Sequence, residues 1–543
     1  MTHPIDRSTR DAGEGAPGRA GLLRRDLLRG AAAGAALTLL PGGAAAQQPA
    51  LALPAAGSPF SDATVPDLAR ALGNRPFAAL PTNDVPDPLK NLSREQYEAI
   101  RIRPGDLIWG GEPHGFAVEP LLRGFYYTDR VALFLVEDGV VRPVTYDRAH
   151  YAGGSEAGEA ALPETAREPG FSGLRIRARF GESHQDFAIF QGACFFRLVG
   201  QDQDFGVDGR ALMLRPADPR GEEFPRWRAL FVERPREPGG PLVIHALIDS
   251  DALAASLRME LRPGETSTAS TTMTLVTRKG IDHLGLGGMQ APFLFGPHDR
   301  RGADDARAAA YAAGGLQIRN GGGEAIWRPV RNPETLQISS FLDNRPEGFG
   351  LIQRDLSPAT FEDDLRRWER CPSLWIEPGG SAGAEGLWGE GAVTLLEIPS
   401  DAEVNENVIA YWRPKANLPA GQEIRLDYRQ NWGREPAPGP FARVTATRSG
   451  RGTAAPRRLF LVDFTGEALF TPEGAPVPLD TVLIASPGRI VEGATRWIAK
   501  PHSRTVRVAF ELDPGSEKAC ELRLALKTGG RQITETWLYR WTP

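Results

Sequence analysis

Short apolar runs, alternating or continuous, recur along most of the chain and are separated by Gly, Pro and Asp. Leu174–Phe180, Pro241–Ile248 and Ser267–Thr277 are examples, and their pattern predicts β-strands. Helical periodicity is confined to a few short segments. Strands at this spacing, joined by turn residues, predict a large antiparallel β-sandwich and an all-β fold.

One part of this pattern contains a strong turn signal. Asp138 and Gly139 separate the apolar runs Arg130–Glu137 and Val140–Tyr146, which predicts a hairpin. The preceding aromatic run, Gly124–Tyr127, is also expected to be a strand.

Three segments have helical features instead. Phe60–Leu72 has helical apolar spacing. Leu92–Ile100 contains Ser93 as a cap with Gln96 three residues later, the spacing of a capping box. Ala306–Gly315 is rich in alanine and ends in a glycine pair, so we expect a short helix with a glycine stop.

The last hundred residues form a second region of short strands. About seven apolar runs in that length predict an immunoglobulin-like sandwich. The Pro- and Gly-rich segment 433–440 before them is the strongest linker candidate. We therefore expect a large sandwich over 59–432, a linker over 433–440 and an immunoglobulin-like domain over 441–543.

The N-terminus has the features of an export signal. Arg24 and Arg25 precede an apolar segment, Ala31–Leu40, that is too short to span a bilayer comfortably. Small residues ending at Ala46 are typical of a cleavage site. We expect a twin-arginine signal peptide over 1–46, cleaved near Ala46, a Pro/Ala-rich tether over 47–58, and a periplasmic mature protein.

Composition narrows the function classes. The 543 residues include 63 Lys and Arg against 68 Asp and Glu, for a net charge of −5. No long basic run occurs, so nucleic acid and anionic membranes are poor candidates as partners. The three cysteines and eight histidines show no metal-ligand spacing, and no nucleotide-binding motif stands out. We expect no metal and no cofactor.

The stretch Cys371–Pro414 combines aromatic rings with carboxylates. Trp375, Trp388 and Trp412 surround a polar loop that contains Glu406 between two asparagines. Rings stack on sugar faces and carboxylates transfer protons at glycosidic oxygens, so this combination is typical of a carbohydrate site. Each tryptophan is about as consistent with a core position, and Glu406 with an ordinary solvated loop carboxylate.

Several segments match a known family in order along the chain. They are Phe116–Tyr127, Gly192–Gly200, Gly221–Pro235, Phe293–Pro297, Ile326–Pro333, Gly348–Arg354, Phe361–Asp363, Pro372–Trp375, Trp388–Pro399, Asn405–Trp412, Val462–Gly466 and Glu535–Tyr539. With them the chain resembles the periplasmic glucan biosynthesis proteins G and D, which act on osmoregulated periplasmic glucans.

This resemblance implies a large sandwich similar to galactose mutarotase, with a groove for glucan, followed by a small immunoglobulin-like domain. Family members are known as inverting β-1,2-glucanases, and some relatives are associated with transglycosylation. Their general acid is an Asp between two asparagines, and Glu406 occupies that position here. Their second carboxylate precedes a Gly-Leu strand start, where this chain has Ala312. Asp299, Asp304, Asp305 and Glu324 are nearby substitutes in sequence.

We therefore expect a periplasmic glucan-processing protein that binds β-1,2-glucan and cleaves it with Glu406 as general acid. A non-hydrolytic glucan-binding protein and a transglycosylase are the alternatives, because Ala312 replaces the second carboxylate. A membrane-bound glucan synthase and a second copy of the chain are candidate partners. The residues expected to shape the sugar subsites are Trp375, Trp388, Tyr411, Arg354, Trp412 and Arg328. An Arg at a strand end, such as Arg328 or Arg354, is more often a paired surface charge.

Overall fold

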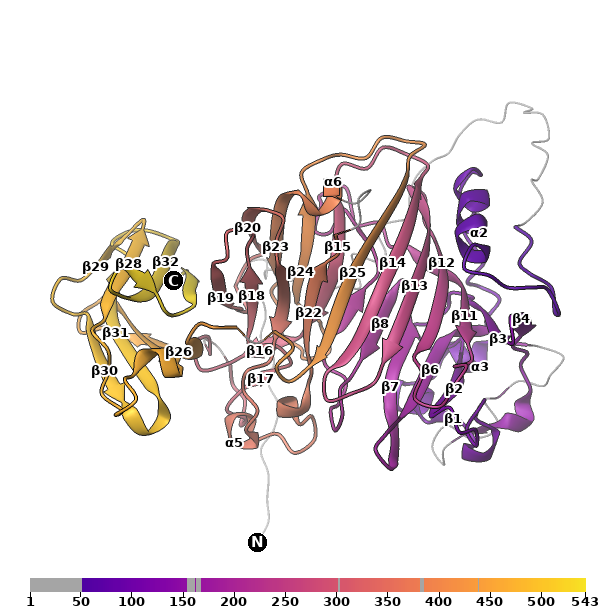
Figure 1. Ribbon diagram of the computed structural model, residues 1–543, viewed down its shortest axis with the longest axis horizontal. Helices are drawn as coiled ribbons and strands as arrows, with labels where there is room; N and C mark the ends of the chain where they lie inside the picture. The colour runs from indigo at the N-terminus through magenta and orange to yellow at the C-terminus, as the bar shows by residue number, and fades with distance from the viewer. Residues whose placement is uncertain (1–50, 154–161, 163–167, 301–302, 381–384, 438) are drawn as a thin grey trace, which may run out of the picture. The chain divides into compact units, whose positions relative to one another are not determined.

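The computed structural model describes residues 51–153, 162, 168–300, 303–380, 385–437 and 439–543 (Figure 1). The chain divides into two compact units after Leu51, and everything below concerns the second, Ala52–Pro543. The expected signal peptide, 1–46, lies outside the described residues, as do positions 47–50 of the tether and position 438 of the linker. Within the described ranges, no helix has the length and apolar character that crossing a bilayer requires.

As predicted, the fold is all-β. A ten-stranded antiparallel sheet has the order β2-β6-β7-β8-β9-β15-β24-β23-β20, with β10 paired to β15. Its strands are β2 (Phe116–Leu122), β6 (Phe171–Phe180), β7 (Ser183–Gln191), β8 (Phe195–Leu198), β9 (Asp208–Arg210), β10 (Met213–Leu214), β15 (Leu284–Ala291), β20 (Gln337–Asn344), β23 (Glu390–Glu397) and β24 (Val408–Pro414).

A second sheet has fifteen strands, in the order β28-β32-β34-β19-β18-β21-β22-β25-β14-β13-β12-β11-β3-β4, with β33 paired to β32. Its strands up to the predicted linker are β3 (Ala132–Glu137), β4 (Val140–Pro143), β11 (Arg226–Glu233), β12 (Leu242–Asp249), β13 (Leu253–Arg262), β14 (Ser267–Thr277), β18 (Gly315–Arg319), β19 (Ala325–Pro329), β21 (Gly348–Ile352), β22 (Ser373–Pro378) and β25 (Glu423–Gly433). The others are β28 (Asp480–Ser486), β32 (Cys520–Thr528), β33 (Arg531–Gln532) and β34 (Thr536–Trp541).

The two large sheets pack face to face through buried aromatic rings. Phe190 of β7 lies 6.1 Å from Trp227 of β11, and Phe196 of β8 lies 6.0 Å from Trp432 of β25, measured between ring centroids. All four side chains belong to one buried apolar cluster. Burying one phenylalanine side chain contributes roughly 1.5–3 kcal/mol, so these contacts hold the sandwich together.

The C-terminal region has its own apolar cluster. A five-stranded sheet consists of β26 (Arg443–Arg451), β27 (Arg458–Thr465), β29 (Arg489–Ile490), β30 (Arg496–Lys500) and β31 (Thr505–Asp513). Phe460 of β27 stacks on Phe510 at 5.3 Å and meets Trp537 of β34 at 6.0 Å. β34 also pairs in parallel with β19, with Trp537 opposite Trp327, so one sheet continues from the large sandwich into this region.

The helices are short. They are α2 (Thr64–Gly73), α3 (Asp87–Lys90), α4 (Arg94–Glu98), α5 (Pro358–Phe361), α6 (Glu385–Trp388) and the 3-10 turns η1 (Pro104–Asp106), η2 (Arg148–His150), η5 (Trp368–Arg370), η6 (Glu467–Leu469) and η7 (Pro501–Ser503). The capping box at Ser93 and Gln96 is confirmed: Gln96 N donates to Ser93 Oγ, and Ser93 N donates to Gln96 Oε1. Two two-stranded ladders, β1 (Ile100–Ile102) with β5 (Tyr151–Gly153) and β16 (Phe293–Phe295) with β17 (Ala310–Tyr311), complete the fold.

Two local predictions are wrong. The predicted helix Ala306–Gly315 contains β17 and the first residue of β18 instead, because Tyr311 pairs with Phe293 of β16 and the alanines on either side of it, Ala309, Ala310, Ala312 and Ala313, are buried. The predicted strand Gly124–Tyr127 is a tight turn closed by the bridge between its end residues. The hairpin at Asp138 is confirmed: Asp138 and Gly139 have φ values of 53° and 76° between β3 and β4.

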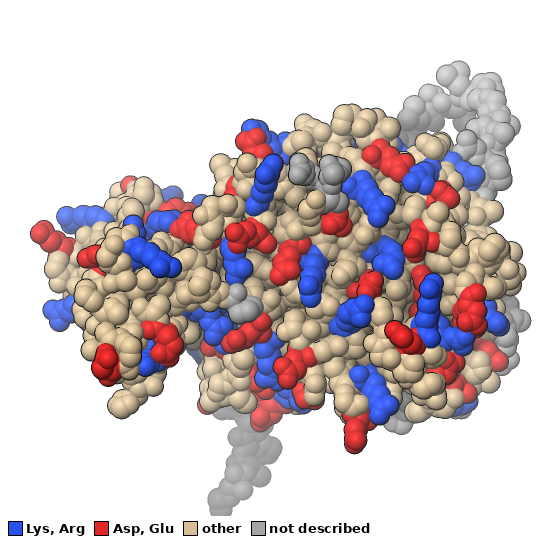
Figure 2. Space-filling model, viewed as in Figure 1, with Lys and Arg blue, Asp and Glu red and all other residues tan. Residues whose placement is uncertain are grey.

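Charged side chains of both signs are interspersed over the face drawn in Figure 2, without one large field of a single sign. This distribution agrees with the nearly balanced composition. A neutral polysaccharide does not require a strongly charged surface for binding.

Candidate functional site

Glu406 lies at the end of a loop that two asparagine side chains hold in place. The loop joins β23 to β24, and Glu406 comes two residues before β24 begins. Asn407 accepts a hydrogen bond from Phe293 N at 2.8 Å and donates to the carbonyl oxygens of Phe293 and Ile398, each at 3.0 Å. Asn405 donates to Ser400 Oγ at 3.1 Å. The two amides flanking Glu406 therefore fix the backbone from which its carboxyl projects.

The carboxyl of Glu406 contacts side chains from three strands of the ten-stranded sheet. Arg197 of β8 donates to its Oε1 at 3.1 Å, and Gln290 of β15 donates to its Oε2. Asp208 of β9 is also hydrogen-bonded to Glu406. These residues converge because their strands are neighbours: Gln290 pairs with Asp208 on one side and with Ile409 on the other.

Arg197 connects the two carboxyls. Its Nη2 lies 2.8 Å from Asp208 Oδ2 and 3.1 Å from Glu406 Oε1, and its Nε contacts Asp208 Oδ1. The side chain of Asp208 is only 4% exposed, whereas that of Glu406 is 18% exposed. Glu406 is thus the member of this pair that retains access to solvent.

Burial and, after it, the negative charge of Asp208 raise the pKa of Glu406 to about 8, against the opposing charge of Arg197. A carboxyl with this pKa holds its proton at neutral pH, which is the protonation state that a general acid needs. The sequence pattern identified Glu406 but gave no sign of its partners Asp208, Arg197 and Gln290.

The aromatic residues expected at sugar subsites lie in the core. Trp412 is 0% exposed and donates from Nε1 to Leu387 O at 2.6 Å. Trp388 packs between Trp412 and Tyr428, and Trp375 is 1% exposed. Tyr411 is buried, with its hydroxyl 2.8 Å from His283 Nε2. Protein atoms cover these rings, so the structure gives no support to their predicted role in sugar stacking.

The two arginines expected at sugar subsites form internal ion pairs. Arg328 is buried and donates to Glu397 Oε2 at 3.2 Å. Arg354 forms a two-pronged pair with Glu535, at 2.7 and 2.8 Å, and its guanidinium lies 3.6 Å from the centroid of the Trp327 ring. Both arginines therefore have structural partners, and neither contributes a described contact to Glu406.

The segment expected to contain the second carboxylate is apolar. Ala312 is 0% exposed, and the neighbouring Tyr311 donates its hydroxyl hydrogen to Asp355 at 2.6 Å. Burial raises the pKa of Asp355.

The four carboxylates considered as substitutes are placed as follows. Asp299 pairs with Arg331, Asp305 pairs with Arg307, Glu324 pairs with Arg523, and Asp304 is exposed. None of them has a described contact to Glu406. The carboxylate that lies beside Glu406 is instead Asp208, which is far from Ala312 in the sequence.

One cluster in the described residues has the composition of a metal site. Asp62, Glu233 and His245 have ligand atoms within 4.8 Å of one another. Arg258 Nε lies 3.6 Å from Asp62 Oδ1, and His245 Nε2 lies 2.5 Å from Glu233 Oε1. A cationic guanidinium beside the carboxylates opposes metal binding, so we assign these groups to an ion-pair network.

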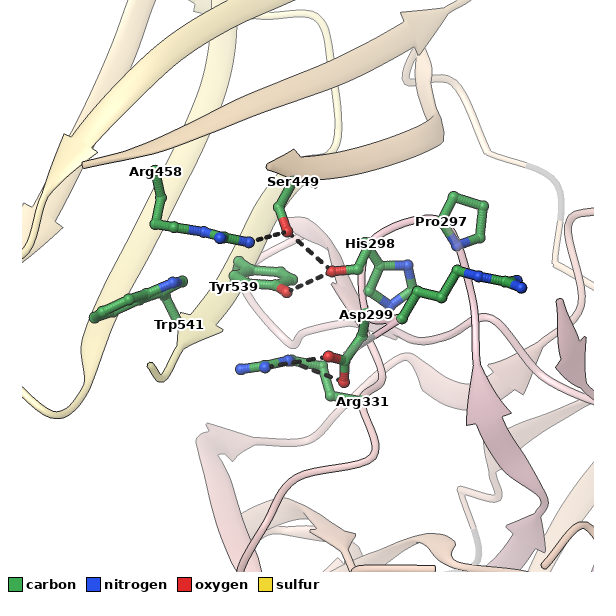
Figure 3. A pocket seen from close by; sticks show the side chains of 9 residues that line it. Pro297, His298, Asp299, Arg331, Ser449, Arg458, Tyr539 and Trp541 are labelled. Carbon is green, nitrogen blue, oxygen red and sulfur yellow. Dashed lines mark hydrogen bonds and ion pairs between the residues drawn. The ribbon is translucent and has the colours of Figure 1, made fainter. Parts of the chain in front are cut away.

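Figure 3 shows a small cavity between the large sandwich and the C-terminal strands. Its volume is about 140 Å³, below the roughly 300–1,000 Å³ typical of small-molecule sites. The carbonyl oxygen of His298 accepts hydrogen bonds there from Ser449 Oγ at 3.1 Å and Tyr539 OH at 3.3 Å. These contacts join the large sandwich to the C-terminal strands, so we assign the cavity a structural role. Glu406 therefore remains the centre of the candidate site.

Comparison with known proteins shows the family of the chain. Residues 60–541 match the family model described as "Periplasmic glucan biosynthesis protein, MdoG". Glucans biosynthesis protein G of Bradyrhizobium diazoefficiens is 38% identical over 523 residues, covering 96% of this chain and 100% of that protein. The proteins of the same name from a Shewanella species and from Vibrio cholerae are 38% and 36% identical, each covering 89% of this chain and 87% of the relative. This chain therefore belongs to the periplasmic glucan biosynthesis family.

Proposed function

We propose that this protein binds β-1,2-linked glucan in the periplasm and cleaves it by an inverting mechanism with Glu406 as the general acid. The observation that supports the acid assignment is the buried carboxyl of Glu406, which is protonated at neutral pH and oriented by Arg197 and Gln290. The relatives named for glucan biosynthesis support the substrate class.

In this mechanism Glu406 donates its proton to the glycosidic oxygen as the bond to the leaving sugar breaks. A water molecule attacks the anomeric carbon from the opposite face, forms the new C–O bond and releases its proton to solvent. Arg197 and Gln290 hold the two carboxyl oxygens, so the proton-bearing oxygen is aimed before the substrate arrives. The charge of Asp208 disfavours a second negative charge beside it and thereby keeps the proton on Glu406. Proton donation of this kind typically contributes 10²–10⁴-fold to a rate.

Asp208 does not meet the geometric requirement for the base of an inverting reaction. That base lies across the sugar from the acid, with the two carboxyls typically about 6.5–9.5 Å apart. One nitrogen of Arg197 lies 2.8 Å from Asp208 Oδ2 and 3.1 Å from Glu406 Oε1, so the two carboxyl groups lie side by side with no room for a sugar between them. Its role in this mechanism is to tune the acid.

A second candidate function follows from Ala312. The segment from Ala309 to Ala313 is buried and contains no carboxylate. A site with an acid and no dedicated water-activating base favours a sugar hydroxyl as acceptor, or glucan binding without turnover. Transglycosylation and non-hydrolytic binding are therefore the alternatives to hydrolysis.

The test is product analysis on linear β-1,2-glucan with the wild type, Glu406→Gln and Glu403→Gln. Glu403 is the matched control, because it lies in the same loop but pairs with Arg307 and Arg366. We expect shorter chains from the wild type and from Glu403→Gln, and at least a 100-fold loss in Glu406→Gln. Rearranged or cyclised chains would indicate transglycosylation, and unchanged chains with intact binding would indicate a binding protein.

We also propose export through the twin-arginine pathway, directed by Arg24 and Arg25. Replacing both with Lys is expected to leave the protein in the cytoplasm, as measured by fractionation of cells that express the full chain. Normal periplasmic recovery of that variant would contradict this route.

A further inference from the structure

The tight turn Gly124–Tyr127 has an unusual backbone. Gly124 N donates to Tyr127 O at 3.1 Å, and Tyr127 N donates to Gly124 O at 2.8 Å. Phe125, at the first central position, has a φ of 51°. Bulky side chains seldom adopt positive φ, and such strain persists only where the surroundings impose it.

Hydrogen bonds from neighbouring segments hold the turn in this strained conformation. Phe125 N donates to Leu89 O at 2.8 Å. The side chain of Arg123, immediately before the turn, is fully buried and donates to Thr128 O at 2.8 Å, Pro81 O at 3.1 Å and Asp84 Oδ1 at 2.6 Å. The turn is thus anchored on both sides.

Tyr97 of α4 packs against two aromatic side chains of the turn. Its ring centroid lies 6.0 Å from that of Phe125 and 5.5 Å from that of Tyr127. Its hydroxyl donates to Leu122 O at 2.6 Å and accepts from Gln191 Nε2 at 2.7 Å. Three aromatic rings are therefore packed together under the exposed tip of the turn.

The tip itself is Tyr126, whose side chain is exposed while its ring packs against Phe125. The residue is 76% exposed, and the two ring centroids are 4.0 Å apart. A rigid backbone and a supporting ring hold this exposed aromatic surface in one orientation. An aromatic ring that is fixed before a ligand arrives loses little conformational entropy on binding.

The next residue connects this surface to Glu406. Tyr127 Cε1 lies 3.9 Å from the position that a Cβ on Gly192 would occupy, close to the start of β8, which contains Arg197. The charges of Arg197, Asp208 and Glu406 reach the Tyr127 hydroxyl, whose pKa is raised chiefly by burial. The turn therefore lies beside the segment that leads into β8, within electrostatic reach of the cluster around the acid.

We propose that Tyr126, supported by Phe125, is a stacking platform for a pyranose ring of the glucan, at a subsite adjoining Glu406. This inference rests on the proposed function for the class of ligand. In this assignment the sugar stacks on an exposed ring, whereas the sequence pattern suggests the tryptophans that the structure buries. A pyranose face presents C–H groups, which pack on an aromatic ring while the sugar hydroxyls remain in water.

The test measures affinity for linear β-1,2-glucan by calorimetry in the Glu406→Gln background, where turnover does not interfere. Tyr126→Ala is expected to weaken binding about tenfold, the loss of one good aromatic contact. Tyr126→Phe keeps the ring and is expected to bind within about twofold of its parent. Trp497→Ala is the matched control, since Trp497 is also an exposed aromatic residue, 44% accessible, in the C-terminal region.

Tyr126 is exposed, so its removal is not expected to impair folding, and equal melting temperatures will check this. Unchanged affinity in Tyr126→Ala, or an equal loss in Trp497→Ala, would overturn the platform and leave the acid assignment intact. A parent protein that binds no β-1,2-glucan would overturn the platform together with the proposed ligand. Full turnover by Glu406→Gln would refute the acid assignment alone, and the platform would then be tested by comparing the KM of Tyr126→Ala with that of the wild type.

Discussion

Asp208 and Glu406 lie almost 200 positions apart in the sequence, yet they accept hydrogen bonds from the same nitrogen of Arg197, at 2.8 and 3.1 Å. The two carboxyls share one guanidinium, so only one positive charge is available to balance them. Asp208 accepts from both Nε and Nη2 of Arg197, whereas Glu406 accepts from Nη2 alone. Ionising Glu406 as well would leave a negative charge without compensation in a mostly buried place, so Glu406 retains its proton. This relationship gives the candidate site a pH dependence that can be measured.

The first prediction concerns the pH profile of glucan turnover. If Glu406 donates the proton, activity falls on the alkaline side with a midpoint near its pKa of about 8. Asp208→Asn removes a neighbouring negative charge, which lowers the pKa of Glu406, so that midpoint is expected to move to lower pH. Rates measured from pH 5 to 10 check this. An alkaline limb that does not move in Asp208→Asn would show that Asp208 does not raise the pKa of the acid.

The second prediction concerns stability and needs no substrate. The pKa of Glu406 is raised in the folded protein from an ordinary value of 4.5 to about 8. Glu406 therefore imposes no cost on folding below about pH 4.5, and the cost grows as the pH rises from about 4.5 to about 8 and stays constant above that. Glu406→Gln is expected to match the wild type at pH 4.5 and to exceed it at pH 8.5, by on the order of a few kcal/mol.

Chemical denaturation at the two pH values measures this difference. Glu403→Gln serves again as the control, since it removes a loop carboxylate that is paired with two arginines. A stability gain in Glu406→Gln that is equal at both pH values would show that the carboxyl does not titrate in this range.

The third prediction separates structure from binding at Arg354. Its side chain is 9% exposed and that of its partner Glu535 is 2% exposed. Removing one member of a buried ion pair typically costs about 3–5 kcal/mol, so Arg354→Met should lower the free energy of unfolding by that amount. Glucan affinity of the folded fraction is expected to be unchanged.

Lys415→Met is the comparison for Arg354→Met. Lys415 pairs with Glu390 at 2.7 Å, and both side chains are more than 60% exposed. A surface pair contributes about 0–1 kcal/mol, so this change should be nearly neutral. A selective loss of glucan affinity in Arg354→Met at unchanged stability would restore the sugar-binding assignment.

The fourth prediction concerns Trp412. Trp412→Phe keeps a ring in the core but removes the hydrogen bond from Nε1 to Leu387 O. Leaving a buried carbonyl without its donor costs about 1–3 kcal/mol. We expect a lower melting temperature and glucan turnover within about twofold of the wild type, as measured on folded protein.

The sequence predicted the strands well because period-two apolar patterns are local. Val408–Trp412 lies within β24, and the capping box at Ser93 depends on residues three positions apart. The helix predicted over Ala306–Gly315 failed for a non-local reason. Alanine has a high helix propensity, but four of these alanines, Ala309, Ala310, Ala312 and Ala313, pack in the core, and the pairing of Tyr311 with Phe293 decides the local structure.

The site was only partly predictable for the same reason. Glu406 has a local signature between Asn405 and Asn407. Arg197, Asp208 and Gln290 reach it only through the pairing of β9 with β15 and β15 with β24, which short sequence segments do not encode. The tryptophans were ambiguous because rings that stack on sugar and rings that fill a core have the same composition and spacing.

The parallel pairing of β19 with β34 has a consequence for expressing the large sandwich and the C-terminal region as separate proteins. A protein ending near Gly433 would lack β34 and leave Ile326 and Trp327 of β19 without their outer partners. The separate C-terminal fragment would in turn lack the strand beside Trp537. Bare strand edges recruit other chains, so each half expressed alone is expected to self-associate. Co-expression of the two halves would let each supply the missing neighbour of the other.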